Sequence, residues 1–145
     1  MTSGTDGKTS VGGAKTSPSI PVSTRHKRAG YDQEDSFQIE AASFFDLCLP
    51  VDSVWCHVPN GGKRAMTTAR RLKAMGTKAG MPDNLIIYRG RAYWIELKAR
   101  YGNLAESQTI AIPLIESAGS PVAIARTLED IAAALSGWGI PLRAS

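Results

Sequence analysis

The residues of this sequence best suited to act together chemically are Asp83, Glu96 and Lys98. Two carboxylates held close together repel each other unless a cation lies between them, and hard divalent cations such as Mg²⁺ prefer oxygen ligands. Such a cation activates water and relieves the negative charge of a phosphate ester under attack. A neighbouring lysine can hold the water and stabilise the developing charge. These residue types therefore indicate a site for a divalent cation, with Lys98 at its edge.

A predicted β-hairpin brings the two carboxylates together. Residues 84–88 and 91–95 are rich in β-branched and aromatic side chains, and only an Arg-Gly pair separates them, which favours a tight turn. Counting back from such a turn places Asp83 directly opposite Glu96. Opposed residues share a face of the sheet, with Cβ atoms roughly 4.5–5.5 Å apart. Lys98 lies two residues beyond Glu96 and therefore joins the same face.

The segments around these residues resemble a known family of nucleases. Pro82 and Asp83, followed by Glu96, Leu97 and Lys98, resemble the PD-(D/E)xK signature of metal-dependent nucleases. The resemblance extends over roughly residues 31–142 and is to stand-alone members of the VRR-NUC family, of the phage and prophage type. The segments that match this family in order and spacing are 57–64, 72–76, 80–83, 104–108 and 138–141.

The resemblance implies a fold and roles for individual residues. The implied fold is α/β, a PD-(D/E)xK restriction-endonuclease-like core with a mixed β-sheet flanked by helices. The implied metal ligands are Asp83, Glu96 and the backbone carbonyl of Leu97, and Lys98 is the implied catalytic lysine. Gln108 matches a family glutamine that approaches this lysine, although an exposed helix residue would look the same in the sequence.

The first predicted helix supplies two more candidates. Family members carry an acid and a glutamine here that reach the active site, and we transfer these roles to Glu34, as a catalytic residue and metal ligand, and to Gln38. Glu40 is the alternative acid. A plain exposed helix start would also favour Glu34, because an acid there suits the helix dipole. The sequence departs from the family at Asn84, where an apolar residue is usual, and at Ala105, where a small hydroxyl residue is common.

The pattern of apolar residues, glycines and prolines predicts an α/β domain with a mixed sheet. Pro113 is expected to kink or divide its helix, and the strand at 121–125 is expected to be fully buried. Ala69, Leu72 and Met75 would form the apolar side of their helix. In chain order the predicted elements are a helix from about 33 to 48, a strand at 53–58, a helix at 64–75, the hairpin, a helix at 105–118, a strand at 121–125 and a helix at 127–136.

Positive charge is concentrated around the candidate site. The chain has a formal net charge of +4, but residues 60–100 contain ten basic side chains and two acids, Asp83 and Glu96. Residues 31–59, by contrast, contain six acids and no lysine or arginine. Basic residues that neutralise phosphates supply most of the sequence-independent affinity for nucleic acids. A polyanionic partner is therefore predicted, and the resemblance to nucleases implies that it is DNA, although a solvated, charged helix surface would have the same composition.

The candidates for this DNA contact share either a basic side chain or a place in the glycine-rich turn after residue 59. Backbone amides in such a turn can approach a phosphate closely. The candidates are Asn60, Gly61, Gly62, Lys63, Arg64, Arg70, Arg71, Lys73, Lys78 and Arg100. His57, just before the turn, is either a general base or a structural histidine in a half-buried strand.

Residues 1–29 and 30–145 differ in composition. The first segment is rich in Gly, Ser, Thr and Lys and is predicted to be a disordered basic tail, whereas the second forms the nuclease-like domain. The basic cluster at 25–28 either adds DNA affinity or belongs to a plain linker. No segment has the pattern of a signal peptide or a membrane span, so a soluble cytoplasmic protein is expected. Cys48 and Cys56 are then expected to be buried, reduced thiols.

These observations predict a metal-dependent, structure-specific DNA endonuclease that uses no small-molecule cofactor. The resemblance and the stand-alone size imply branched DNAs as substrates, four-way junctions or flaps, and the two-fold symmetry of a junction predicts a homodimer. The dimer interface would lie either near Trp138, Ile140 and Leu142 or on the acidic first helix. The alternatives are a non-catalytic nucleic-acid-binding protein with the same fold and a structural protein whose hairpin carboxylates are surface charge.

Overall fold

The computed structural model describes residues 22–60 and 65–143, with side chains from residue 33 onward. Within these ranges the chain forms helices and strands in the order expected of an α/β domain. They are α1 (Val22–Cys48), β1 (Ser53–His57), α2 (Met66–Ala74), β2 (Asn84–Tyr88), β3 (Arg91–Leu97), α3 (Glu106–Ser117), β4 (Val122–Ala125) and α4 (Leu128–Gly137).

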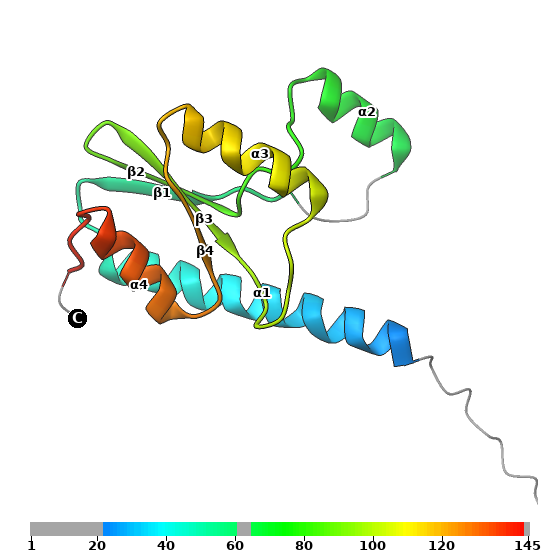
Figure 1. Ribbon diagram of the computed structural model, residues 1–145, viewed down its shortest axis with the longest axis horizontal. Helices are drawn as coiled ribbons and strands as arrows, with labels where there is room; N and C mark the ends of the chain where they lie inside the picture. Colours follow the sequence, from blue (N-terminus) through cyan, green and yellow to red (C-terminus); the bar gives the residue numbers. More distant parts are fainter. Residues whose placement is uncertain (1–21, 61–64, 144–145) are drawn as a thin grey trace, which may run out of the picture.

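The strands form one mixed sheet in the order β1-β2-β3-β4. The pairs β1–β2 and β2–β3 are antiparallel, and β4 joins β3 in parallel after the crossover through α3. Figure 1 shows α1 and α4 on one side of the sheet and α3 on the other, while α2 projects beyond the end of the sheet. The predicted fold class, a mixed sheet flanked by helices, is confirmed.

The hairpin of β2 and β3 has the predicted register. Arg89 and Gly90 both have positive φ, 48° and 76°, as a two-residue type I′ turn requires. Asn84 accordingly pairs with Ile95 at the far end of the hairpin. The next position along each strand is Asp83 and Glu96, so the turn fixes their opposition.

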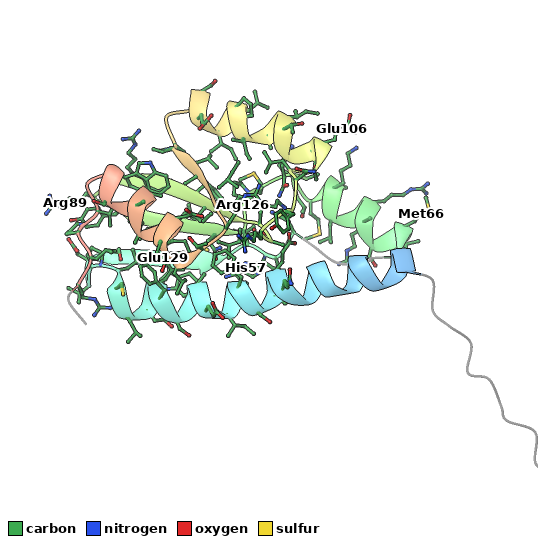
Figure 2. All side chains as sticks on the ribbon, turned by 60° about the horizontal axis from the view of Figure 1, so that its bottom comes forward. His57, Met66, Arg89, Glu106, Arg126 and Glu129 are labelled. Atoms are coloured by element: carbon green, nitrogen blue, oxygen red, sulfur yellow. The ribbon has the colours of Figure 1, made fainter. Side chains whose placement is uncertain are left out.

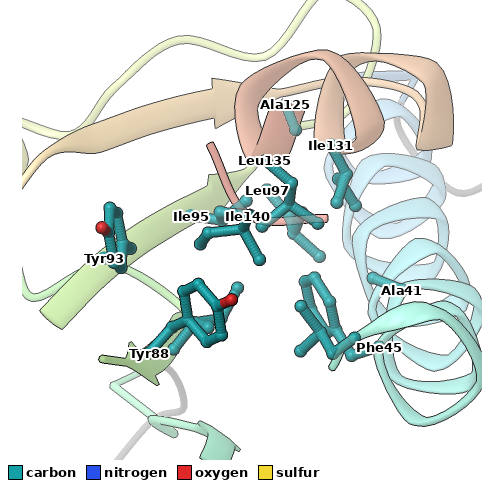
Figure 3. Packing of buried hydrophobic residues seen from close by; sticks show 12 residues of the cluster. Ala41, Phe45, Tyr88, Tyr93, Ile95, Leu97, Ala125, Ile131, Leu135 and Ile140 are labelled. Carbon is teal, nitrogen blue, oxygen red and sulfur yellow. The ribbon is translucent and has the colours of Figure 1, made fainter. Parts of the chain in front are cut away.

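The hydrophobic core lies between the sheet and the pair α1 and α4 (Figure 3). Ile95 of β3, Phe45 of α1 and Ile131 of α4 are all at most 1 % exposed. Fully burying side chains of this size stabilises the fold by about 1.5–3 kcal/mol each. The C-terminal segment completes this core, because Ile140 is buried and the Trp138 ring packs on the Tyr93 ring at 5.2 Å between centroids. Ile140 is therefore not free for a dimer interface, whereas Trp138 is half-buried.

Two helices differ from their predicted form. Helix α1 begins at Val22 rather than near Gln33, so residues 22–29, predicted as part of the disordered tail, are helical instead. The basic residues in this stretch are compatible with a helix. Helix α3 runs unbroken through Pro113, which was expected to kink or divide it. Pro113 and Thr109, the residue whose carbonyl loses its helical partner, are both exposed, so water can satisfy that carbonyl.

Two strands are less buried than predicted because they lie at the edges of the sheet. In β4, expected to be fully buried, Ile124 is 42 % exposed. In β1, at the opposite edge, Cys56 is exposed, contrary to the expectation of a buried thiol. His57 is likewise exposed rather than half-buried. An edge strand lacks a neighbour on one side, which leaves its side chains open to solvent.

Helix α2 packs less than predicted, and it has no buried side chain. Met75, expected on its apolar side, is 70 % exposed, and Ala69 is also exposed, while Leu72 is half-buried. Figure 2 shows Met66 at the outer edge of the molecule, and Arg89 at the opposite end of the sheet. Over the ranges described, no helix is both long enough and apolar enough to cross a bilayer.

Candidate active site

A cleft of about 440 Å³ opens at the end of the sheet where β2 begins and β3 ends. The element that contributes the acids is the β2–β3 hairpin, while α1 and α3 contribute amide and acidic side chains from the two sides. All six residues predicted to be catalytic line this cleft, namely Glu34, Gln38, Asp83, Glu96, Lys98 and Gln108. Residues separated by more than 70 positions in the chain therefore meet at one place.

Asp83 is held by the strands on both sides of it. Its carboxylate Oδ2 accepts a hydrogen bond from the backbone N–H of Leu97 at 2.8 Å. Its backbone carbonyl accepts a bond from the N–H of Val58 at 2.7 Å and lies 2.8 Å from Nδ1 of His57. These bonds to β1 and β3 fix both the main chain and the carboxylate of Asp83.

Glu96 is a charged residue in a nearly fully enclosed position, with 1 % of its surface exposed. Its Oε1 forms an ion pair with Nζ of Lys98 at 2.8 Å and accepts a hydrogen bond from Nε2 of Gln108. Its other oxygen, Oε2, is buried and has no hydrogen-bond partner in the described structure. A buried acceptor without a partner is costly, and such a group calls for an explanation.

The electrostatics of the pair favour a cation. Burial raises the pKa of the Asp83 carboxyl above its ordinary value, against the opposing effects of the Leu97 N–H and Lys98. Burial also raises the pKa of Glu96, and the charge of Asp83 raises it further, although the hydrogen bond to Lys98 lowers it. Two desolvated carboxylates are thus incompletely neutralised by the groups around them.

The residues present fit a hard divalent cation. The unpartnered Oε2 of Glu96 and the carboxylate of Asp83 supply oxygen donors, and Mg²⁺ binds to one or two protein carboxylates while retaining waters. Among the described side chains, no three of His, Cys, Asp or Glu gather as a metal cluster. Glu34, predicted as a further metal ligand, therefore does not gather with Asp83 and Glu96 into such a cluster.

Gln108 is fixed at both ends of its amide. Its Oε1 accepts a hydrogen bond from the backbone N–H of Ala105 at 2.9 Å, and its Nε2 donates to Glu96. Ala105 precedes the first turn of α3 and has no hydroxyl with which to cap the helix. The side chain of Gln108 thus accepts the bond from the free backbone N–H at the start of α3. Through the same amide it orients the Glu96 carboxylate.

The loop before Asp83 lies directly against the start of α3. A Cβ atom on Gly80 would lie 2.2 Å from the carbonyl oxygen of Ser107, and Gly80 has a φ of +80°. Both the close approach and the left-handed conformation require glycine here. Gly80 therefore sets the spacing between the hairpin and the helix that carries Gln108.

Of the two candidate acids on α1, Glu34 lines the cleft of Asp83 and Glu96. Its Oε1 accepts a hydrogen bond from the backbone N–H of Ala99 at 3.3 Å. Glu40 instead lines a neighbouring hollow of about 410 Å³, together with Arg100 and Arg126. The structure thus separates the two acids, which the spacing along the helix alone does not.

Gln38 does not contact either carboxylate through a described hydrogen bond. Its amide forms a reciprocal pair with Asn84: Nε2 of Gln38 donates to Oδ1 of Asn84 at 2.9 Å, and Nδ2 of Asn84 donates to Oε1 of Gln38 at 3.0 Å. Asn84 is fully buried. No role for Asn84 was predicted from the sequence, although a polar residue at the start of an apolar strand indicates that its side chain has a hydrogen-bond partner.

The predicted DNA-binding residues have different environments. Asn60 lines the cleft, but its Nδ2 donates to the backbone carbonyl of Met81 at 2.7 Å, which ties the two loops together. Gly61, Gly62, Lys63 and Arg64 lie outside the described residues. The exposed cations are Arg70, Arg71, Lys73, Lys78 and Arg100.

One basic residue near the cleft was missed. Arg126, after β4, donates to the backbone carbonyl of Ala99 at 2.6 Å and so contacts the segment that follows Lys98. Over residues 33–60 and 65–143, the one ion pair that the structure shows joins Lys98 and Glu96. Among these described residues, Arg126 therefore has no acid within ion-pair distance.

Comparison with known proteins gives little beyond this geometry. No family model matches the chain, and no curated protein matches it. A solved structure described as "VRR_NUC domain protein" is similar at 25 % sequence identity and a TM-score of 0.46. The similarity covers 64 % of this chain and 67 % of that chain.

Proposed function

We propose that the protein is a metal-dependent endodeoxyribonuclease whose active site is the cleft of Asp83, Glu96 and Lys98. The observation that carries the proposal is the buried Oε2 of Glu96, which lacks a partner beside a second desolvated carboxylate. A Mg²⁺ or Mn²⁺ ion held by Asp83, Glu96 and the carbonyl of Leu97 would supply Lewis acidity toward the phosphate and a nucleophilic water at neutral pH.

The side chains of the cleft have separate tasks in this mechanism. Lys98 places a positive charge 2.8 Å from Glu96 at the edge of the cleft, where it can orient the attacking water and stabilise charge on the phosphate oxygens. Gln108 keeps the Glu96 carboxylate in one orientation. Glu34 contributes a further acid from α1, one turn from Gln38.

The basic surface around the cleft supports a nucleic-acid substrate. Helix α2 buries none of its side chains, and its last turn carries Arg71 and Lys73. A short helix that contributes nothing to the core gains little from tertiary packing, so its sequence is free to serve a partner. A phosphate backbone is the partner that fits exposed cations without acidic neighbours.

Branched DNA and a homodimer belong to the same proposal and rest on the sequence resemblance. Because Trp138 and Ile140 are used in the core, the interface would lie on α1. Its Ile39 and Leu47 are 69 % and 68 % exposed and lie two helical turns apart. A protein with one active site per chain would then cut a four-way junction by paired nicks.

The test is cleavage of linear, flap, fork and four-way DNAs by the purified protein with Mg²⁺, Mn²⁺ or EDTA. Asp83→Asn and Glu96→Gln should abolish cleavage while DNA binding survives. The matched control is Glu116→Gln, a change of the same type at an exposed position on α3, which should cleave like the wild type. DNA binding without cleavage of any substrate under any metal would instead support a non-catalytic binding protein.

A further inference from the structure

The amide pair of Gln38 and Asn84 is the least expected feature of the buried structure. Strand β2 is otherwise apolar, and Asn84 is one of two buried polar or charged residues in the described chain, the other being Glu96. A leucine at this place would bury more apolar surface and would need no partner. The amide of Asn84 must therefore have a role other than stabilising the fold by burial.

The amide of Asn84 fixes the orientation of a side chain, which an apolar residue would not do. Two reciprocal hydrogen bonds of 2.9 and 3.0 Å fix the side-chain torsions of both residues, because neither amide can turn without breaking both bonds. An apolar contact has no such preference. Gln38 lines the cleft while Asn84 is fully enclosed, so a buried residue fixes the position of a side chain at the cleft.

The pair also anchors the part of α1 next to Glu34, where Phe37 is only partly buried against the core. Toward its C-terminal end α1 is fixed by Ala41 and Phe45, which are buried in the core. Toward the N-terminus, Glu34 bonds to the backbone of Ala99 at the longer distance of 3.3 Å. The bonds of Gln38 to β2 are therefore the strong polar tether next to Glu34.

We propose that Asn84 is a positioning residue: through the paired amide it fixes Gln38, and with it the Glu34 turn of α1, against the carboxylates of Asp83 and Glu96. The inference rests on the proposed function of the cleft. Asn84 directly follows Asp83 in the chain, so the same strand start carries the acid and, through the bonds to Gln38, holds α1 beside the cleft.

A double-substitution cycle tests this role. The variants are Asn84→Leu, Gln38→Leu and the combination of both, with Leu135→Ala as the control, because Leu135 is buried in the core on α4 and does not line the cleft. Each is measured for thermal unfolding, for Mn²⁺ affinity by calorimetry well below the transition, and for amide hydrogen exchange over residues 33–38 without metal.

Each single leucine should lower the melting temperature, because it leaves one buried amide without a partner, and the double variant should recover most of that loss. Asn84→Leu should weaken Mn²⁺ binding about ten-fold, as changes in residues that orient metal ligands do. It should also speed exchange over residues 33–38. The double variant should regain stability but not Mn²⁺ affinity, since Gln38 is absent from it. Leu135→Ala should lower the melting temperature and change neither of the other two readouts.

Unchanged exchange over residues 33–38 in Asn84→Leu would overturn the inference, and so would Mn²⁺ affinity equal to that of the wild type. The inference would also be overturned if the loss of Mn²⁺ affinity in the double variant equalled the product of the losses in the two single variants. Two residues that act through one another should lose this affinity only once. Absence of Mn²⁺ binding in the wild type would refute the proposed function instead. The exchange measurement, made without metal, would then still decide whether Asn84 positions α1.

Discussion

Replacing Asp83 by asparagine should stabilise the metal-free protein. In the wild type two desolvated carboxylates face each other, and burial raises the pKa of both. If the two charges are roughly 5 Å apart, like the Cβ atoms of opposed residues, and the effective dielectric constant is about 20, their repulsion before any screening is about 3 kcal/mol. Asparagine removes this repulsion and keeps an oxygen that can accept from the Leu97 N–H.

Two effects reduce the gain in stability that Asp83→Asn obtains from removing this repulsion. The bond from Leu97 to a charged oxygen becomes a bond to a neutral one, which costs about 1 kcal/mol. Lys98, paired with Glu96 at 2.8 Å, already screens some of the repulsion. The expected net gain for Asp83→Asn is about 1–2 kcal/mol, or a rise of roughly 3–8 °C in the melting temperature for a domain of this size.

The assay is thermal unfolding followed by circular dichroism, first in EDTA and then in saturating Mn²⁺. The wild type should gain about 2.7 kcal/mol at a Mn²⁺ concentration of 100 Kd, whereas Asp83→Asn should gain almost nothing. The order of stability should therefore reverse between the two conditions. Glu116→Gln, with the same change of charge at an exposed site, should stay within about 0.5 kcal/mol of the wild type in both.

A variant Asp83→Asn that is no more stable than the wild type in EDTA would refute this reasoning. It would mean that the carboxylates are adequately neutralised by Lys98, Gln108 and the backbone. A variant that still gains stability from Mn²⁺ as strongly as the wild type would place the metal elsewhere. Either result would remove the physical ground on which the cleft was assigned a cation.

Three further predictions follow from the sequence and the cleft. Lys98→Ala should abolish DNA cleavage in a gel assay and leave Mn²⁺ affinity within about three-fold, and full activity would show that Lys98 is a surface charge. Deleting residues 1–29 removes five basic side chains, so DNA affinity in binding titrations should fall and its salt dependence should flatten, without a change in the ranking of substrates. Light scattering should report a dimer at micromolar concentration that Leu47→Glu, an exposed change on α1, converts to a monomer; a monomeric wild type that cuts single flaps alone would remove the junction-cutting role.

The sequence by itself determined the hairpin and the faces of its side chains. A two-residue turn leaves one pairing for the strands, and the period of two along a strand then places Asp83, Glu96 and Lys98 on the same side. These are local rules, in which each step depends on residues close along the chain. The mixed sheet likewise followed from the order of helical and strand patterns, although the exposure of edge strands did not.

Only the tertiary structure decided how the helices meet the hairpin. Glu34 and Glu40 both lie on α1, and the rotation of that helix against the sheet, set by the packing of Phe45 in the core, brings Glu34 into the cleft. The bonds from Gln38 to Asn84 and from Gln108 to Glu96 cross 46 and 12 positions of the chain. Helix rotation and offset depend on the shapes of many side chains at once, so no local spacing specifies them.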